Sequence, residues 1–196
     1  MSEELAIAWI DLSFSVQSLI SRKEKIILNN ISGGFDFGSI NALMGPSGCG
    51  KTTLLKCLNG CNKSGLGIDS KIYLNSKQKI RTCFIYQDQN ERLLKGLTVR
   101  QSLSYASKLK NSNSNVIVNH KNSINQLMSE LLINEIADNL VDNCSGGQLK
   151  RLVIASELTS YQKPNLLLID EPTTGLDSNA AEIVRFSVIK LWSFRF

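Results

Sequence analysis

The sequence predicts an α/β fold built around a mostly parallel sheet. Short strand-like runs alternate with longer helical ones, which is typical of a sheet covered by helices. The run "LLLID" at 166–170 is apolar almost throughout, as expected of a strand buried on both faces. A glycine-rich turn, "GPSGCGKTT" at 45–53, stands between a strand-like run and a helical one.

The hydrophobic pattern of the sequence predicts where each strand and helix lies. Apolar and alternating runs predict strands, and a longer period predicts helices. We expect strands at 5–16, 39–44 (buried), 81–86 and 166–170, and helices at 51–60, at 147–158 and, after a turn at 172–177, at the C-terminal end.

A helical insert separates the two parts of this core. From 98 to about 140 the pattern is helical, with Thr98 and Gln101 spaced as a capping box and a polar interruption at 111–115. We therefore expect one domain over 1–196, with a core of 1–87 and 144–196 and a helical subdomain of about 88–143.

Composition excludes several classes of protein. The 196 residues are 42% apolar and carry a net charge of +5, with the basic residues scattered, so we expect a solvated basic surface and no nucleic-acid partner. Five cysteines without a C-x-x-C pair or a secretory leader favour a reducing, cytosolic compartment. No run approaches the roughly 20 apolar residues that cross a bilayer, so we expect no membrane span in this chain.

The first glycine turn matches the phosphate-binding pattern G-x-x-x-x-G-K-[ST]. A strand-like run before it and a helix after it form the context that the pattern requires. The loop's backbone is expected to close around a β-phosphate, Lys51 to reach the β- and γ-oxygens, and the Thr52 hydroxyl to hold Mg²⁺. The candidate nucleotide-binding residues are Gly45, Pro46, Ser47, Gly48, Cys49, Gly50, Lys51, Thr52 and Thr53.

Two carboxylates follow the buried strand. Asp170 and Glu171 are expected at the carboxyl edge of the sheet, where open α/β folds bind their ligands. Asp170 can hold Mg²⁺ directly or through water, and Glu171 can accept a proton from an attacking water. A strand that merely ends in acidic residues at a turn gives the same pattern, so the phosphate-binding loop is what favours the catalytic reading.

A second glycine turn, "CSGGQLKR" at 144–151, also precedes a helix. Ser145 and Gln148 have capping-box spacing, which accounts for these two residues structurally. The glycines Gly146 and Gly147 remain unexplained by a cap, because glycine in a first helical turn costs stability unless something approaches the backbone closely. A phosphate at the positive end of the helix is one such partner.

The ordered motifs "GPSGCGKTT", "CFIYQDQ", "CSGGQLKR" and "LLLIDEPTTGLD" resemble those of the ATP-binding cassette (ABC) family. The resemblance extends from about Leu5 to Ile189, and details such as "LTVRQSL" are most similar to subfamily G, the eye-pigment and sterol half-transporters. It implies an ABC ATPase fold, a P-loop NTPase core with an N-terminal antiparallel portion. It also implies an ATP- and Mg²⁺-dependent ATPase on the cytoplasmic side of a membrane, attached to the transmembrane domain of a full-length exporter.

The resemblance also implies why one chain carries two glycine turns. Two such domains dimerise head to tail, and each ATP lies between the P-loop of one domain and the signature of the other, here Ser145, Gly146, Gly147 and Gln148. Gln87 resembles the glutamine that reaches Mg²⁺ and the attacking water. Asp177 resembles the aspartate that crosses the interface. Phe14 stands where the family has an aromatic that stacks on adenine, although a core aromatic is an equally good reading.

This sequence departs from the family pattern at two places. Cys144 replaces the usual leucine of the signature. The family also continues into a further strand and a switch histidine some thirty residues after the Walker B glutamate, whereas 196 − 171 = 25 residues follow Glu171 here. We therefore expect a C-terminally truncated domain without that strand, that histidine or the transmembrane domain. Two alternatives stay open: a truncated module that binds ATP without hydrolysis, and a soluble ABC ATPase.

Overall fold

The computed structural model describes residues 5–17, 24–86, 93–113 and 116–195. The chain divides into two compact units. The first comprises residues 1–84 and 165–170, and the second comprises residues 85–164 and 171–196. The predicted subdomain of 88–143 has different bounds and stays a prediction.

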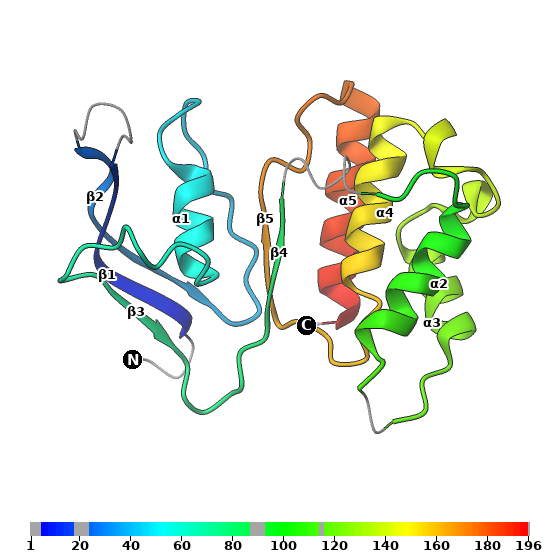
Figure 1. Ribbon diagram of the computed structural model, residues 1–196, viewed down its shortest axis with the longest axis horizontal. Coiled ribbons are helices and arrows are strands. Elements are labelled where there is room, and N and C mark those ends of the chain that lie inside the picture. The colour runs from blue at the N-terminus through cyan, green and yellow to red at the C-terminus, as the bar shows by residue number, and fades with distance from the viewer. Residues whose placement is uncertain (1–4, 18–23, 87–92, 114–115, 196) are drawn as a thin grey trace. The chain divides into compact units, whose positions relative to one another are not determined.

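A three-stranded antiparallel sheet forms most of the first unit. Strand β1 (Leu5–Gln17) lies between β2 (Glu24–Asp36) and the short β3 (Lys71–Leu74), and it pairs antiparallel with both (Figure 1). The pairing of β1 with β2 is interrupted by register shifts, and Asp11 and Asn30 adopt positive φ angles there. Such irregularities bend a strand and increase its twist.

The core of the first unit lies between this sheet and helix α1 (Lys51–Leu58). Strand β1 buries Ile7 and Leu12 completely, and the register shift between Trp9 and Leu12 allows both of these odd-spaced side chains to be buried. Helix α1 contributes Leu54, Leu55, Cys57 and Leu58 from one face and contacts β2. Burial raises the pKa of the Cys57 thiol to about 11, so this cysteine behaves as a small apolar side chain.

Strands β4 (Thr82–Ile85) and β5 (Leu166–Ile169) form a second, two-stranded sheet. Asn165 fixes its start, because its side-chain oxygen accepts from the Arg81 N–H and its own N–H donates to the Arg81 carbonyl. The fold is therefore mixed α/β, with antiparallel and parallel sheets. Within the described residues the antiparallel sheet has more strands, so the mostly parallel character expected from sequence is limited to β4 and β5.

The buried strand predicted at 39–44 is wrong. These residues form no regular element and are exposed, with Met44 86% accessible. The segment satisfies its polar side chains locally, since Ser39 donates to the Asp36 carbonyl and Asn41 donates to Ser39. Local side-chain bonds of this kind offer the backbone an alternative to the hydrogen bonds of a sheet.

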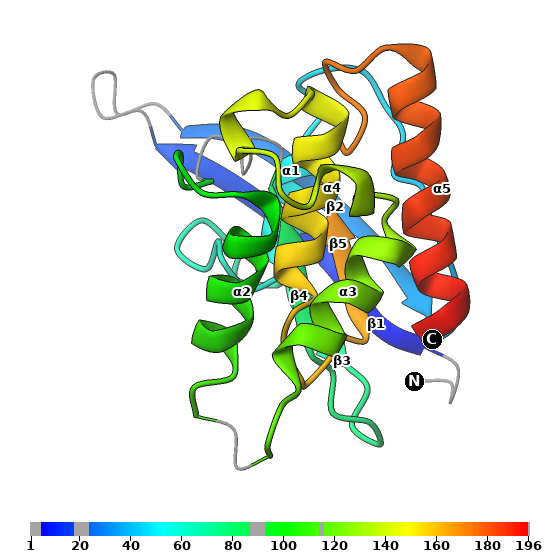
Figure 2. The same cartoon turned by 90° about the vertical axis from the view of Figure 1, so that its right-hand side faces the viewer.

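Helices make up the second unit. They are α2 (Val99–Lys110), α3 (His120–Glu130), α4 (Gly146–Glu157) and α5 (Ser178–Arg195), with short 3₁₀ turns η2 (Asn134–Ile136) and η3 (Val141–Asn143). Helix α2 contacts α3 and α4, and α5 contacts α4 and α3 (Figure 2). The helices expected within 98–140, at 147–158 and at the end of the chain are confirmed, as are the strands at 5–16, 81–86 and 166–170 and the helix at 51–60.

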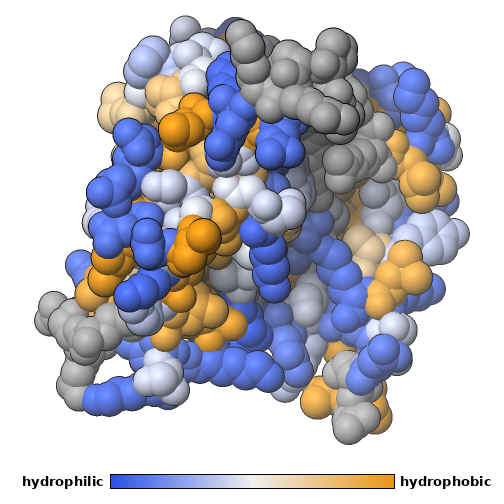
Figure 3. Space-filling view, turned by 60° about the vertical axis from the view of Figure 1, so that its left-hand side comes forward, coloured by the Kyte–Doolittle hydropathy of each residue, from blue (hydrophilic) through white to orange (hydrophobic). Residues whose placement is uncertain are grey.

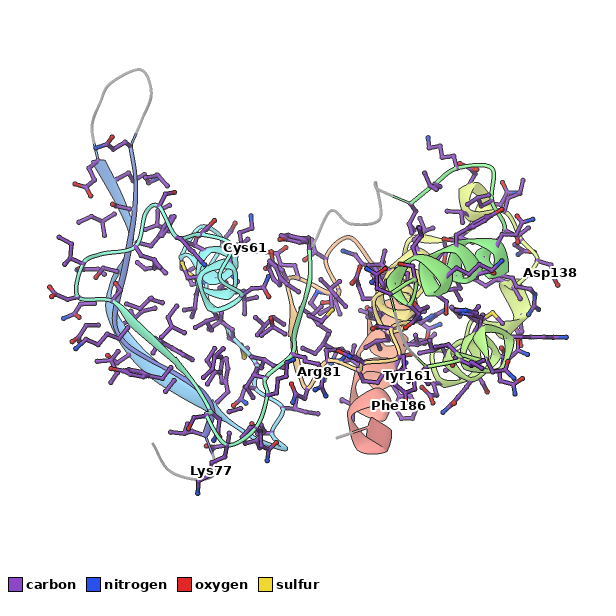
Figure 4. The ribbon with its side chains drawn as sticks, turned by 60° about the horizontal axis from the view of Figure 1, so that its bottom comes forward. Cys61, Lys77, Arg81, Asp138, Tyr161 and Phe186 are labelled. Carbon is purple, nitrogen blue, oxygen red and sulfur yellow. The ribbon has the colours of Figure 1, made fainter. Side chains whose placement is uncertain are left out.

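The core of the second unit is aliphatic. Leu103, Leu127, Leu131, Leu152 and Leu158 are almost fully buried, and each such side chain contributes roughly 1.5–3 kcal/mol on burial. The predicted capping box of α2 is confirmed, because Thr98 and Gln101 each accept from the other's backbone N–H. An ion pair lies on the surface of this unit. Figure 4 labels Asp138, which lies 3.1 Å from the guanidinium of Arg100.

Hydrophobic and hydrophilic side chains are mixed on the visible face of the molecule (Figure 3). On the face shown in Figure 3, hydrophobic side chains appear in small groups among hydrophilic ones. None of the described helices has both the length and the hydropathy of a bilayer-spanning segment.

Candidate functional site

The predicted phosphate-binding loop is an exposed turn that leads directly into α1. Residues 45–49 are exposed, and the loop turns through Gly48 and Gly50, whose φ angles are 80° and 101°. The helix starts at once, because the Leu54 N–H donates to the Gly50 carbonyl. Gly50 also lies against β2: a Cβ there would be 2.8 Å from Leu28 Cδ2 and 3.3 Å from the Ile27 carbonyl oxygen.

We expect Gly50→Ala to destabilise the chain more than Gly38→Ala does. Both glycines have left-handed φ angles, which cost an alanine about 1–2 kcal/mol, but Gly38 has open space around its Cα. Overpacking against buried Leu28 adds roughly 1–3 kcal/mol at Gly50. Urea unfolding of both variants measures the difference, and equal losses would show that Gly50 does not pack closely against β2.

Lys51 folds back over the loop. Its ammonium group donates to the carbonyls of Gly45 at 2.8 Å and Pro46 at 2.9 Å, and lies 3.9 Å from the sulfur of Cys49. The cation is thereby held above a turn of exposed backbone at the N-terminal end of a helix. This geometry suits an anion with several oxygens, as expected of a phosphate cradle.

Thr52 connects the loop to the end of β5. Its hydroxyl donates to Asp170 Oδ1 at 3.0 Å, across 118 positions of sequence. Asp170 is buried, with 5% of its surface accessible. The two motifs predicted to share a metal are therefore adjacent within the first unit.

The oxygen donors of Thr52 and Asp170 fit Mg²⁺. The structure shows no gathering of three or more His, Cys, Asp or Glu side chains anywhere in its described ranges, which leaves this pair without the ligand set of a protein-only metal cage. Mg²⁺ is commonly held by one or two protein oxygens, with substrate phosphates and waters completing the octahedron. A hydroxyl hydrogen-bonded to a buried carboxylate matches that pattern.

Glu171 is the first residue of the second segment, 171–196, of the second unit, and its backbone is unusual. Its φ angle is 45°, in the left-handed region that non-glycine residues seldom adopt. Its carboxylate oxygen Oε2 accepts a hydrogen bond of 2.8 Å from the Thr174 hydroxyl. Sequence reasoning did not identify Thr174, because nothing in its spacing distinguishes it from other turn threonines.

Ser145 is the N-cap of α4, as predicted. The Gln148 N–H donates to its hydroxyl at 3.4 Å, and its own N–H donates to Gln148 Oε1 at 2.8 Å. The N–H groups of Gly146 and Gly147 belong to the first turn and cannot be satisfied by the helix itself. Ser145 and Gly146 are exposed, so the Gly146 N–H can meet a ligand from outside the unit, whereas Gly147 is buried.

The two glycines of this turn also have a packing role that sequence reasoning missed. A Cβ on Gly147 would lie 3.0 Å from Ala180 Cβ of α5, and one on Gly146 would lie 3.2 Å from Leu176 Cδ2. Asp177 caps α5 by accepting from the Ala180 N–H at 2.8 Å. The structure therefore brings the candidate signature and the segment containing Asp177 together within the second unit.

Burial shifts the pKa values of two residues near this turn, Cys144 and Arg151. Burial raises the pKa of Cys144, whose sulfur donates to the Leu140 carbonyl. Arg151 is 7% accessible, and its Nε has no hydrogen-bond partner among the described residues. Burial lowers the pKa of this guanidinium. Sequence reasoning did not single out Arg151.

Phe14 lies in the core of the first unit. It is 8% accessible, and its ring lies beneath Gly65, where an added Cβ would approach it to 2.5 Å. The packing matches the core reading that the sequence left open. Stacking on adenine therefore stays a prediction that would require the segment at Gly65 to move.

Two further residues complete the comparison with the sequence-based predictions. Gln87, the predicted Mg²⁺ and water contact, lies outside the described residues. His120, to which the sequence motifs assign no role, is half-buried, and its Nδ1 lies 2.8 Å from the Ser107 hydroxyl. That contact joins α2 to the start of α3.

Comparison with known proteins gives a consistent result. The family described as ABC transporter matches residues 28–174. The chain is 35% identical over 186 residues to ABC transporter G family member 13 of Arabidopsis thaliana, and 36% identical over 185 residues to ABC transporter G family member 1 of Dictyostelium discoideum. These alignments cover 91% and 87% of the chain, but only 27% and 23% of the two relatives. The chain thus spans about a quarter of the length of these curated relatives.

Solved structures share the fold. The cbiO1 protein of Clostridium perfringens, part of an ABC transporter complex, superposes with a TM-score of 0.78 at 21% identity, covering 98% of this chain and 75% of that one. A bacterial ABC transporter cassette solved as a dimer gives 0.74 at 20% identity, covering 96% and 83%.

Proposed function

The chain belongs to the ABC transporter family, and from this premise we propose that it binds and hydrolyses Mg²⁺-ATP to drive a transporter of the G-subfamily type. The observation that carries the proposal is the hydrogen bond between Thr52 and Asp170. This hydrogen bond joins the phosphate-binding loop to the end of β5, and a nucleotide site needs a residue from each of these two segments. The contact supports the proposal because it brings together two oxygen donors that one Mg²⁺ ion could bind.

Binding rests on the loop and its cation. Lys51, now bonded to the Gly45 and Pro46 carbonyls, would turn toward the β- and γ-phosphate oxygens of ATP. The backbone N–H groups at the start of α1 would contact the β-phosphate. Thr52 and Asp170 would hold Mg²⁺, which would supply positive charge to offset the charge of the phosphates.

Hydrolysis needs a group that takes a proton from the attacking water. We assign this role to Glu171, with Gln87 orienting the water. The signature residues Ser145, Gly146, Gly147 and Gln148 would contact the γ-phosphate of an ATP held by a second ABC ATPase domain. Asp177 would cross the same interface. The two glycine turns of this chain would then serve two ATP molecules in one dimer.

The curated relatives also suggest the setting. Their names describe ABC transporters of the G family, including ATP-binding cassette sub-family G member 5 of Mus musculus, which is 30% identical over 177 residues. We propose that this domain works on the cytoplasmic side of a membrane, attached to the transmembrane domain of the complete transporter.

The dependence of ATP binding on Mg²⁺ tests the proposal. In wild type, Mg²⁺ should strengthen binding of a fluorescent ATP analogue relative to binding in EDTA. Asp170→Asn should remove most of this gain, which we expect to be about 10–100-fold. Asp36→Asn, an exposed carboxylate in the same unit, should keep it. An unaltered Mg²⁺ gain in Asp170→Asn would contradict the assignment of the metal site, and wild type without detectable ATP binding would contradict the function.

A further inference from the structure

The residue proposed as general base sits in a constrained turn. The Glu171 backbone has φ 45°, and a non-glycine residue in this region costs about 1–2 kcal/mol relative to the right-handed region. Such conformations persist only where the surrounding structure determines them. The turn that follows supplies this support, since the Thr174 N–H donates to the Glu171 carbonyl and the Leu176 N–H donates to the Thr173 carbonyl.

The side chain of Glu171 is held by the same turn. The Thr174 hydroxyl donates to Oε2 at 2.8 Å, within the range of a hydrogen bond to an ionised carboxylate. A free glutamate side chain rotates about three bonds, and fixing it costs conformational entropy each time the base must be aligned. The hydrogen bond lowers this cost before substrate arrives.

We propose that Thr174 is a positioning residue, whose hydroxyl fixes the orientation of the Glu171 carboxylate. The inference rests on the proposed function, because it assigns Glu171 the role of base. One carboxylate oxygen is engaged by Thr174, which leaves Oε1 as the oxygen that accepts the proton from water. The two carboxylate oxygens of Glu171 thus have different roles: Oε2 accepts the hydrogen bond from Thr174, and Oε1 accepts the proton.

Threonine suits this role better than serine would. Its branched Cβ restricts χ1, so the hydroxyl stays near one direction. It also lies only three positions from Glu171, and Gly175 allows the following reversal with φ 76°. Both partners are therefore supplied by one short turn, which depends little on the rest of the unit.

Steady-state ATPase of three variants tests the positioning role. Thr174→Val replaces the hydroxyl with a methyl group of similar shape, and we expect kcat to fall about tenfold with KM for ATP unchanged. Thr174→Ser restores the hydroxyl and should recover most of kcat. Thr173→Val is the matched control from the same turn, because in the described part of the chain no hydrogen bond reaches its hydroxyl. A Thr174→Val variant with wild-type kcat, or one whose ATP affinity falls in parallel, would overturn the proposal.

A second measurement does not depend on turnover. Side-chain scalar couplings of Glu171 in solution report whether its χ angles populate one rotamer or several. Wild type and Thr174→Ser should show one dominant rotamer, and Thr174→Val should show averaging. Identical couplings in wild type and Thr174→Val would overturn the proposal. If wild type binds ATP without hydrolysing it, the hydrolytic part of the proposed function fails, while the couplings still decide whether Thr174 holds the carboxylate.

Discussion

Replacing Lys51 with alanine is expected to weaken ATP binding by about ten- to a hundredfold. The change removes the loop's cation and with it charge-assisted hydrogen bonds to phosphate worth roughly 1.5–3 kcal/mol. The fold should survive, because the Gly45 and Pro46 carbonyls that Lys51 now contacts lie on an exposed turn where water can replace the ammonium group.

Titration with a fluorescent ATP analogue measures this loss. Lys56→Ala is the matched control, because it removes the same charge from the last turn of the same helix, five positions along. Thermal unfolding should show that both variants remain folded. Equal affinities in wild type and Lys51→Ala would rule out the loop as the phosphate site.

Local features of the fold were the most predictable from sequence. The capping boxes of α2 and α4 depend on residues three apart, and both form as their spacing indicates. The meeting of Thr52 and Asp170 across 118 positions was also predicted, because each motif carries its own structural context.

Features that depend on distant packing were not predictable. The glycines at 146 and 147 indicate a close approach to the backbone, for which phosphate is one candidate. Ala180 of α5 also lies against Gly147, and nothing near Gly147 in the sequence predicts contact with a helix that begins at Ser178. The sequence around Phe14 fits a ligand-stacking ring and a core ring equally well, and only the packing of Gly65 against the ring favours the core. At 39–44 the apolar composition predicts a buried strand. The segment is instead exposed, and its polar side chains form local hydrogen bonds.

The second large effect concerns the signature turn. In a Glu171→Gln background, which removes the proposed base and so preserves bound ATP, the chain should form an ATP-dependent dimer. Ser145→Arg should abolish that dimer, because a long cationic side chain at the exposed N-cap of α4 would occupy the space of the partner's γ-phosphate. Its effect on the chain's own ATP affinity should be small, because the proposal assigns Ser145 to the ATP held by the partner domain and not to the chain's own ATP.

The matched control is Ser112→Arg, which adds the same side chain to an exposed position at the end of α2. This variant should dimerise as the Glu171→Gln chain does. Loss of dimer in both variants would point to general charge repulsion and away from the signature.

Light scattering of the Glu171→Gln chain with and without Mg²⁺-ATP, repeated with Ser145→Arg, tests most directly whether the two glycine turns serve two ATP molecules. The account predicts that ATP doubles the mass of the Glu171→Gln chain, and that Ser145→Arg keeps the monomer mass while binding ATP with nearly unchanged affinity. An ATP-dependent dimer that persists in Ser145→Arg, or an equal loss of ATP binding and dimerisation in a folded variant, would contradict it.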